Sequence, residues 1–249
     1  MANIRGEFYS DIAKGNICGH VAGTKFGRNA AISVGSFSTI AHGVTGAYTG
    51  FNATGAETVS IVSGDANDTS AGTGARTIIL YGLDTNLLEI SETVTLNGLT
   101  PVVSTLLYKR LDRVKVVTAG STGHNVGDIT INQSTTTAVV FAVIPATYNS
   151  TMIAAITVPS NKTGYLISQT ASIASKTAAS ADIGIQSRAV GEVFRVNGEA
   201  SINSVGTGIA LMDFTIPHKF EGGTDMFIEA DGSSGVSVTA FMDIIYVTN

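Results

Sequence analysis

The sequence predicts an all-β protein made of two domains. Short segments rich in β-branched residues are interrupted about every 8–12 residues by Gly, Asn or Asp, as in proteins built from many short strands. One segment near the C-terminus alternates apolar and polar residues over a long stretch. No stretch of similar length shows the 3.6-residue apolar spacing of a helix. These observations favour strands throughout the chain.

In the first half, residues 78–81 and 90–96 are expected to form strands. Asn97-Gly98 follows the second of them and is a pair preferred by the two-residue type I′ hairpin turn, in which both residues have positive φ. The same pair, Asn197-Gly198, lies between two further strand-like segments. We therefore expect a hairpin turn at each of these places.

Residues 236–247 give the clearest strand. Apolar side chains occupy every second position from Val236 to Tyr246, and the positions between them become apolar towards the end of the segment. This pattern predicts a strand with one face in a core and with both faces covered at its end.

The alternation is lost at residues 145–150, which we interpret as a domain boundary. Residues 1–146 are expected to form an N-terminal β-sandwich domain, and residues 147–249 a C-terminal jelly-roll-like domain. Residues 175–181 are expected to form one helical turn or a loop. About eight strands are expected in the second domain, around residues 151–158, 163–173, 182–189, 192–197, 199–204, 209–216, 224–230 and 235–248.

The chain carries unusually few charges. Charged residues make up 13% of it, about half the usual share of roughly 25%, and hydrophobic residues make up 44%. The surface of such a chain is covered by uncharged polar residues or buried against other subunits, and both can hold together. The net charge of −5 disfavours nucleic acid as a partner, because phosphates require a basic patch. No apolar run approaches the roughly 20 residues that span a bilayer, so no membrane partner is expected.

The densest basic cluster is interrupted by Asp112 and is expected to line the solvated edge of a strand. It comprises Lys109, Arg110, Arg113 and Lys115. The single cysteine, Cys18, excludes an internal disulfide and is expected to be a buried or incidental thiol.

No motif predicts a metal site. Residues 65–68 begin like a calcium-binding loop, but position six of that pattern is Ser70 instead of Gly, and position twelve is Arg76 instead of Glu. An EF-hand is therefore excluded, although a surface cation held by Asp65 and Asp68 is left open. The four histidines lack the spacing of zinc ligands. They are His20, His42, His124 and His218.

Glycan cleavage is the enzymatic activity that most needs testing. It requires two carboxylates roughly 5–10 Å apart in a cleft. Glu89 and Glu92 are three residues apart and would point to opposite faces of a strand, and the chain has no Trp to bind a sugar. We therefore expect no enzyme, with no catalytic residue, no cofactor and no metal ligand.

Segments in both halves share a pattern with one class of proteins. In the first half they are residues 74–78, 81–84, 90–98 and 119–121, and in the second half residues 157–159, 162–166 and 223–246. Together they cover roughly half of the chain. They resemble virion structural proteins of tailed bacteriophages, many of them from aquatic hosts.

The resemblance implies a particle component that performs no chemistry, foremost a capsid decoration (cement) protein. Its implied partners are the major capsid protein and further copies of itself in a homotrimer, on the outer surface of the capsid after synthesis in the host cytoplasm. The irregular, Gly-rich residues 2–35 are our candidate for the shell-contacting segment. Individual partner-binding residues are not predicted. The alternative is a tail fibre or a tail/head adaptor protein acting as a binding module.

Overall fold

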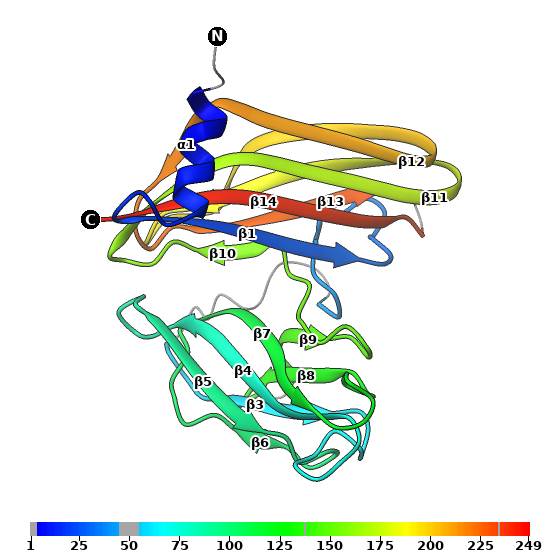
Figure 1. Cartoon of the computed structure of the whole chain (residues 1–249). Coiled ribbons are helices and arrows are strands. Elements are labelled where there is room, and N and C mark those ends of the chain that lie inside the picture. Colours follow the sequence, from blue (N-terminus) through cyan, green and yellow to red (C-terminus); the bar gives the residue numbers. More distant parts are fainter. Residues whose placement is uncertain (1–3, 45–54, 137, 234) are drawn as a thin grey trace.

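The structure, a computed structural model, describes residues 4–44, 55–136, 138–233 and 235–249. The described residues form one helix and fourteen strands, so the all-β prediction is confirmed. The strands make three sheets, of seven, four and three strands. Figure 1 shows two bodies, with the large sheet in the upper one and the two small sheets in the lower one.

The large sheet contains strands from both ends of the chain. Its strands are β1 (His20–Asn29), β2 (Ser38–Thr39), β10 (Ala155–Thr157), β11 (Lys162–Arg188), β12 (Arg195–Phe220), β13 (Asp225–Gly232) and β14 (Ser237–Thr248). They are ordered β1-β14-β11-β13-β10, with β12 paired to β11 and β2 paired to β13.

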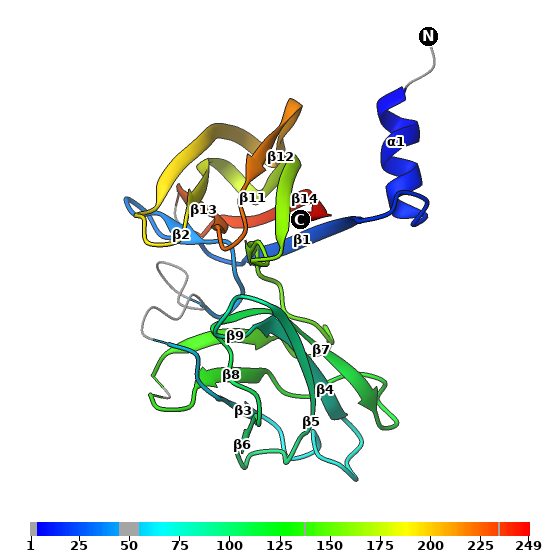
Figure 2. The same ribbon diagram turned by 90° about the vertical axis from the view of Figure 1, so that its left-hand side faces the viewer.

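The long ribbon of β11 and β12 folds the large sheet over. The first half of β11, residues 162–174, pairs with β14, whereas residues 181–188 pair with β13. A register shift between Ser175 and Ala178 lies between the two halves, where a bulge lets the ribbon bend. Figure 2 shows this arch. Side chains of both halves, among them Ile173 and Ile183, therefore share one buried core.

The lower body is built from the middle of the chain. Its four-stranded sheet contains β6 (Val102–Val103), β3 (Val59–Ser63), β8 (Ile129–Gln133) and β9 (Val140–Ile144), in that order. Its three-stranded sheet contains β5 (Glu89–Thr95), β4 (Ala75–Leu83) and β7 (Arg110–Ala119). Buried residues of both sheets, such as Ile61 and Ile78, form a second core.

This pairing corrects the predicted architecture. The predicted division placed residues 1–146 in one β-sandwich domain, but residues 20–29 pair with β14 over ten positions and lie in the large sheet. The described strands form neither two sandwich domains nor a jelly roll in residues 147–249, because that sheet needs β1 and β2 as well. Sequence alternation identifies strands but carries no information on which distant strands pair.

Several predicted elements are confirmed and others are wrong. Residues 78–81 lie in β4, residues 90–95 in β5 and residues 237–247 in β14, where Met242 and Ile244 are buried. Asn197-Gly198 is not a turn, because both residues lie within β12. At Asn97-Gly98 the strand does end, but of the two residues only Gly98 has positive φ, so the turn is not type I′.

The second half contains fewer and longer strands than predicted. Residues 163–173 and 182–189, expected as separate strands, lie almost entirely in β11, and the three expected between 192 and 216 lie mostly in β12. The expected helical turn or loop at residues 175–181 is the bend of β11. Its Ser, Thr and Ala side chains are small enough to follow a bulge, which a search for uninterrupted alternation does not recognise.

The helix α1 (Ile4–Ala13) was not predicted. It stands beside β1 and projects away from the large sheet (Figures 1 and 2). The helix ends where Gly15 adopts a φ of 76° and donates its backbone N–H to the carbonyl of Ile12. Among the described residues no helix is long and apolar enough to cross a membrane.

The two bodies are joined by shared apolar packing. Ala41, Ile153, Ala155 and Phe227 belong to segments of the large sheet or its connections, yet they are buried in the core of the lower body. Within the upper body, backbone segments also approach each other closely. A Cβ on Gly27 of β1 would lie 2.1 Å from the carbonyl oxygen of Ile40, so only glycine fits there.

Candidate functional site

The carboxylates tested for glycan cleavage hold neighbouring segments together. Glu92 accepts hydrogen bonds from the backbone N–H groups of Thr105 at 2.8 Å and Leu106 at 3.0 Å. Glu89 forms an ion pair with Lys162 at 2.5 Å. Each carboxylate therefore already has partners that explain its position without a substrate.

Asp68, left open as a cation ligand, is fully buried and saturated by hydrogen bonds. Its donors are the hydroxyl of Ser63 at 2.6 Å and the backbone N–H groups of Ala75, Val126 and Gly127 at 2.7–2.9 Å. Asp65 accepts both the backbone and the side-chain N–H of Asn67. Because donors surround both Asp68 oxygens, a shared cation at Asp65 and Asp68 does not fit.

The described residues contain no group of three or more His, Cys, Asp or Glu side chains that could hold a metal ion. His20 and His124 each contact a backbone carbonyl oxygen through Nδ1. His218 packs on the ring of Phe214, with 4.3 Å between ring centroids. Cys18 is exposed rather than buried.

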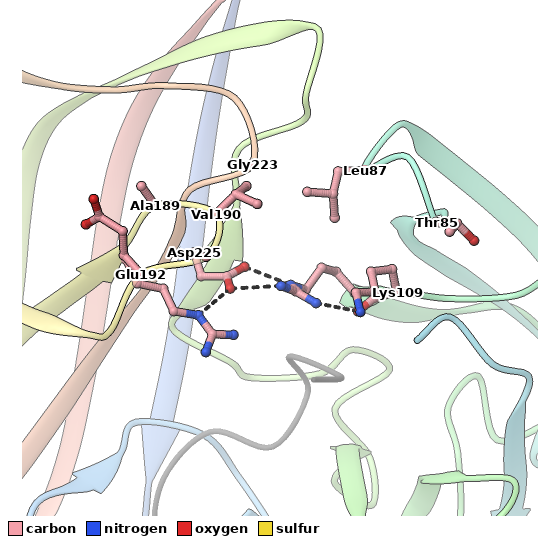
Figure 3. Close-up of a pocket in the computed structure, with 11 residues that line it drawn as sticks. Thr85, Leu87, Lys109, Ala189, Val190, Glu192, Gly223 and Asp225 are labelled. Carbon is pink, nitrogen blue, oxygen red and sulfur yellow. Dashed lines mark hydrogen bonds and ion pairs between the residues drawn. The ribbon is translucent and has the colours of Figure 1, made fainter. Parts of the chain in front are cut away.

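The most concentrated polar centre lies between the two bodies and is organised around Asp225 of β13. One of its oxygens accepts Arg110 Nε at 2.7 Å and the hydroxyl of Thr157 at 2.6 Å. The other accepts Arg110 Nη2 at 2.9 Å and Arg188 Nε at 2.8 Å. Arg110 comes from β7 of the lower body, so a bidentate ion pair connects the bodies (Figure 3).

Aromatic packing extends this centre. The guanidinium carbon of Arg188 lies 4.3 Å from the ring centroid of Phe194, a distance suited to a cation–π interaction. Phe194 meets Phe227 edge to face, with centroids 5.0 Å apart. Phe227 in turn is buried in the core of the lower body. The ion pairs of Asp225 are thus continuous with the apolar packing that joins the two bodies.

The same centre borders a pocket of about 460 Å³, lined also by Lys109, Val190 and Glu192. Asp225 is a poor general base for a ligand in this pocket, because four hydrogen bonds already occupy its carboxylate. The arrangement is suited to holding two bodies in a fixed orientation.

A second contact between the bodies surrounds Lys25 of β1. The Lys25 side chain is buried and donates a hydrogen bond to the carbonyl oxygen of Asp112, while Arg113 Nη2 donates to the carbonyl oxygen of Thr24 at 2.8 Å. Burial lowers the pKa of Lys25 to about 8, with Asp112 opposing the shift and Arg113 adding to it. Burial also raises the pKa of the Asp112 carboxyl.

These contacts correct the interpretation of the basic cluster. Arg110 is buried rather than on a solvated strand edge, and Asp112 and Arg113 face the other body. The sequence offered only a run of charged residues, which is normally solvated and therefore gave no signal of a buried partner. The partner of Arg110, 115 residues away, could not be read from spacing.

Large apolar side chains are exposed on both bodies. In the lower body Leu99, Val103 and Leu107 are each more than half exposed, along residues that run through β6. In the upper body Val205, Ile209 and Leu211 of β12 are 75%, 69% and 65% exposed. Figure 1 places β6 and β12 at opposite ends of the molecule.

Comparisons with known proteins do not identify the chain. No family model matches it, and no curated protein matches it. Among solved structures, a tryptic core variant of Cry1Da from Bacillus thuringiensis is similar over 87% of this chain and 53% of its own, at 10% identity and a TM-score of 0.22. The VP2 subviral particle of infectious bursal disease virus is similar over 92% of this chain and 72% of that chain, also at 10% identity and a TM-score of 0.22.

This chain therefore spans about half the length of the Cry1Da structure. Scores this low establish neither a shared fold nor a shared function. The functional argument rests on the residues of this chain.

Proposed function

We propose that the chain is a non-enzymatic structural component of a tailed-phage particle, namely a capsid decoration (cement) protein that binds and stabilises the shell of the major capsid protein. The observation that carries the proposal is the exposure of large apolar side chains at two opposite ends of a molecule with few charges. Large apolar side chains that are more than half exposed, in a chain with so few charges, favour a surface that a partner covers.

Exposed apolar side chains at two separate ends suit a protein that partners cover on more than one side. Burying one exposed Leu or Val side chain contributes about 1.5–3 kcal/mol, so Leu99, Val103 and Leu107 together can anchor a shell contact. Several such weak contacts in one assembly multiply affinity through effective concentration. We assign the end that contains β6 to the major capsid protein and the end that contains β12 to neighbouring copies or the outer surface.

The polar centres support a mechanical role. Asp225 and Asp68 are each saturated by hydrogen bonds, and Glu89 and Glu92 connect segments of the chain. The ion pairs Arg110–Asp225 and Lys162–Glu89, together with the shared core, fix one body on the other, as a protein under outward strain from a shell would need.

Copy number tests the proposal. The ratio of this protein to the major capsid protein in purified particles is measured by quantitative mass spectrometry. Hundreds of copies per particle are expected for a protein that coats the shell. A few copies, or a few tens, would reject decoration and support the alternative, a tail fibre or a tail/head adaptor.

A further inference from the structure

Strand β12 is an exposed edge of the large sheet. It pairs with β11 along one side, and no described strand pairs with its other side. Natural edge strands are normally protected against further pairing by charged residues, Pro or short length. Residues 200–212 of β12 contain no charged residue and no Pro, in a strand of 26 residues. This edge is therefore open to another strand.

The outer face of β12 carries aliphatic side chains that nothing in the described chain covers. Val205, Ile209 and Leu211 lie on one face, because side chains alternate along a strand, and each is at least 65% exposed. Ile202, on the opposite face, is buried in the core. The exposed residues are therefore not part of the fold's own packing.

The pattern of β12 is symmetric about Gly208. Val205 and Leu211 are equally distant from it, as are Thr207 and Ile209. Farther from Gly208, the buried Ile202 corresponds to the inward-facing Phe214. The outward-facing Asn203 corresponds to Asp213, and Ser201 corresponds to Thr215. A sequence with this symmetry presents matching side chains when two copies of it run antiparallel.

We propose that β12 pairs antiparallel with β12 of a second copy of this chain, about a two-fold axis at Gly208. Val205 then lies opposite Leu211, and Thr207 opposite Ile209, each pair occurring twice as a two-fold interface requires. The Asn203 amide faces the Asp213 carboxylate, so the only charged residue between 200 and 218 meets a hydrogen-bond donor. A strand from an unrelated protein would not require this symmetry.

The contact is small enough to be reversible. Residues 203–213 provide about eleven residues per copy, fewer than the roughly 20–30 of a standard interface. We therefore expect a dissociation constant in the micromolar range for the isolated protein. The pairing does not rest on the proposed function, because a protein from a tail or a fibre would dimerise in the same way.

The first experiment measures the molar mass of the purified full-length chain by sedimentation between about 1 and 200 µM. We expect a monomer–dimer equilibrium that Ile209→Lys weakens at least tenfold, because two lysines then approach each other near the axis. Val21→Lys, at an exposed position on β1, is the matched control and should leave the equilibrium unchanged. A monomer at all concentrations, or equal effects of both variants, would overturn the proposal.

Cross-linking tests the register. In a Cys18→Ser background, Val205→Cys and Leu211→Cys chains are oxidised separately and as a mixture. The mixture should form disulfide dimers, because the two positions lie opposite each other. Each variant alone should not, because its own two copies of the new residue are about 20 Å apart. Cross-linking of either variant alone, or none in the mixture, would reject the symmetric register.

Discussion

At the scale of single residues, several of the chain's few charges lie inside the molecule. Asp225 receives two arginines from different bodies, and the Arg110 side chain is 9% exposed while that of Asp225 is 3% exposed. Taking ionised groups out of water is costly, so such a pair is tolerated only when its hydrogen bonds are complete. Here the hydrogen bonds are complete. Removing one partner should therefore cost far more free energy than the intact pair contributes to stability.

Replacing Asp225 should therefore destabilise the protein strongly. Asp225→Asn leaves Arg110 and Arg188 without a compensating charge, and loss of one partner of a buried pair costs about 3–5 kcal/mol. Urea unfolding followed by circular dichroism measures this loss. Glu192→Gln is the matched control, because it removes one carboxylate from the exposed ion pair with Arg195 in the same pocket. Equal losses in the two variants would contradict the role given to Asp225.

Lys25 makes stability depend on pH. Its pKa of about 8 in the folded chain lies below the roughly 10.4 of an unfolded lysine. Between these values the unfolded chain binds more protons, so the free energy of unfolding should rise with pH, by roughly 1.5 kcal/mol from pH 8 to pH 9.5. The measurement stops at pH 9.5, because burial raises the pKa values of Tyr108 and Tyr246, which reverses the trend at higher pH.

Lys25→Met is the control for this pH dependence. Met has a similar length and no charge, so most of the increase between pH 8 and pH 9.5 should disappear in the variant, and the smaller rest comes from Lys109, whose pKa burial also lowers. An unchanged increase would assign the effect to another group.

At the scale of elements, the sequence predicts a strand well where the strand is regular and packs by simple alternation. Residues 236–247 are the clearest case, and β14 forms there. The same reasoning predicts two separate strands in place of β11, because alternation alone cannot distinguish a bulge at Ser175 from the end of a strand. It also predicts a turn at Asn197-Gly198, because this pair prefers turns. In the structure the long-range pairing of β12 with β11 overrides that local preference.

The candidate site was harder to predict than the strands. Arg110 and Asp225 were both visible as charged residues, but their contact requires the relative placement of two bodies, which no local pattern encodes. The exclusion of an EF-hand rests on local spacing, which is the kind of information that one sequence does contain.

The helix α1 should be dispensable for folding. Ile12 is buried but belongs to neither hydrophobic core, and the helix contacts β1. Deleting residues 2–14 should lower the free energy of unfolding by about 1.5–3 kcal/mol, the contribution of the buried Ile12. The deletion also decides between two shell contacts, because occupancy on purified shells falls if residues 2–14 contact the shell and stays unchanged if only the end that contains β6 does. Quantitative binding to shells measures this, with the urea midpoint as the control. Unchanged occupancy would reject residues 2–14 as a shell contact.

At the scale of the whole molecule, the two joined bodies expose large apolar side chains on β12 and beside β6. These strands lie at opposite ends of the molecule (Figure 1). If each end serves a different contact, the contacts should be separable by mutation. Leu99→Ser with Leu107→Ser removes two exposed leucines from the lower body, each contributing about 1.5–3 kcal/mol when buried. Shell affinity should fall at least about a hundredfold, while the monomer–dimer equilibrium stays unchanged.

Ile209→Lys should give the opposite result. Dimerisation is lost, while a single chain still binds the shell through the end that contains β6, at the lower avidity of one contact. Shell binding by the two variants is compared under the same conditions with sedimentation of each variant alone. If each variant lost both properties together, the rigid joint around Asp225 would be transmitting damage between the bodies, and the assignment of one contact to each end would be wrong.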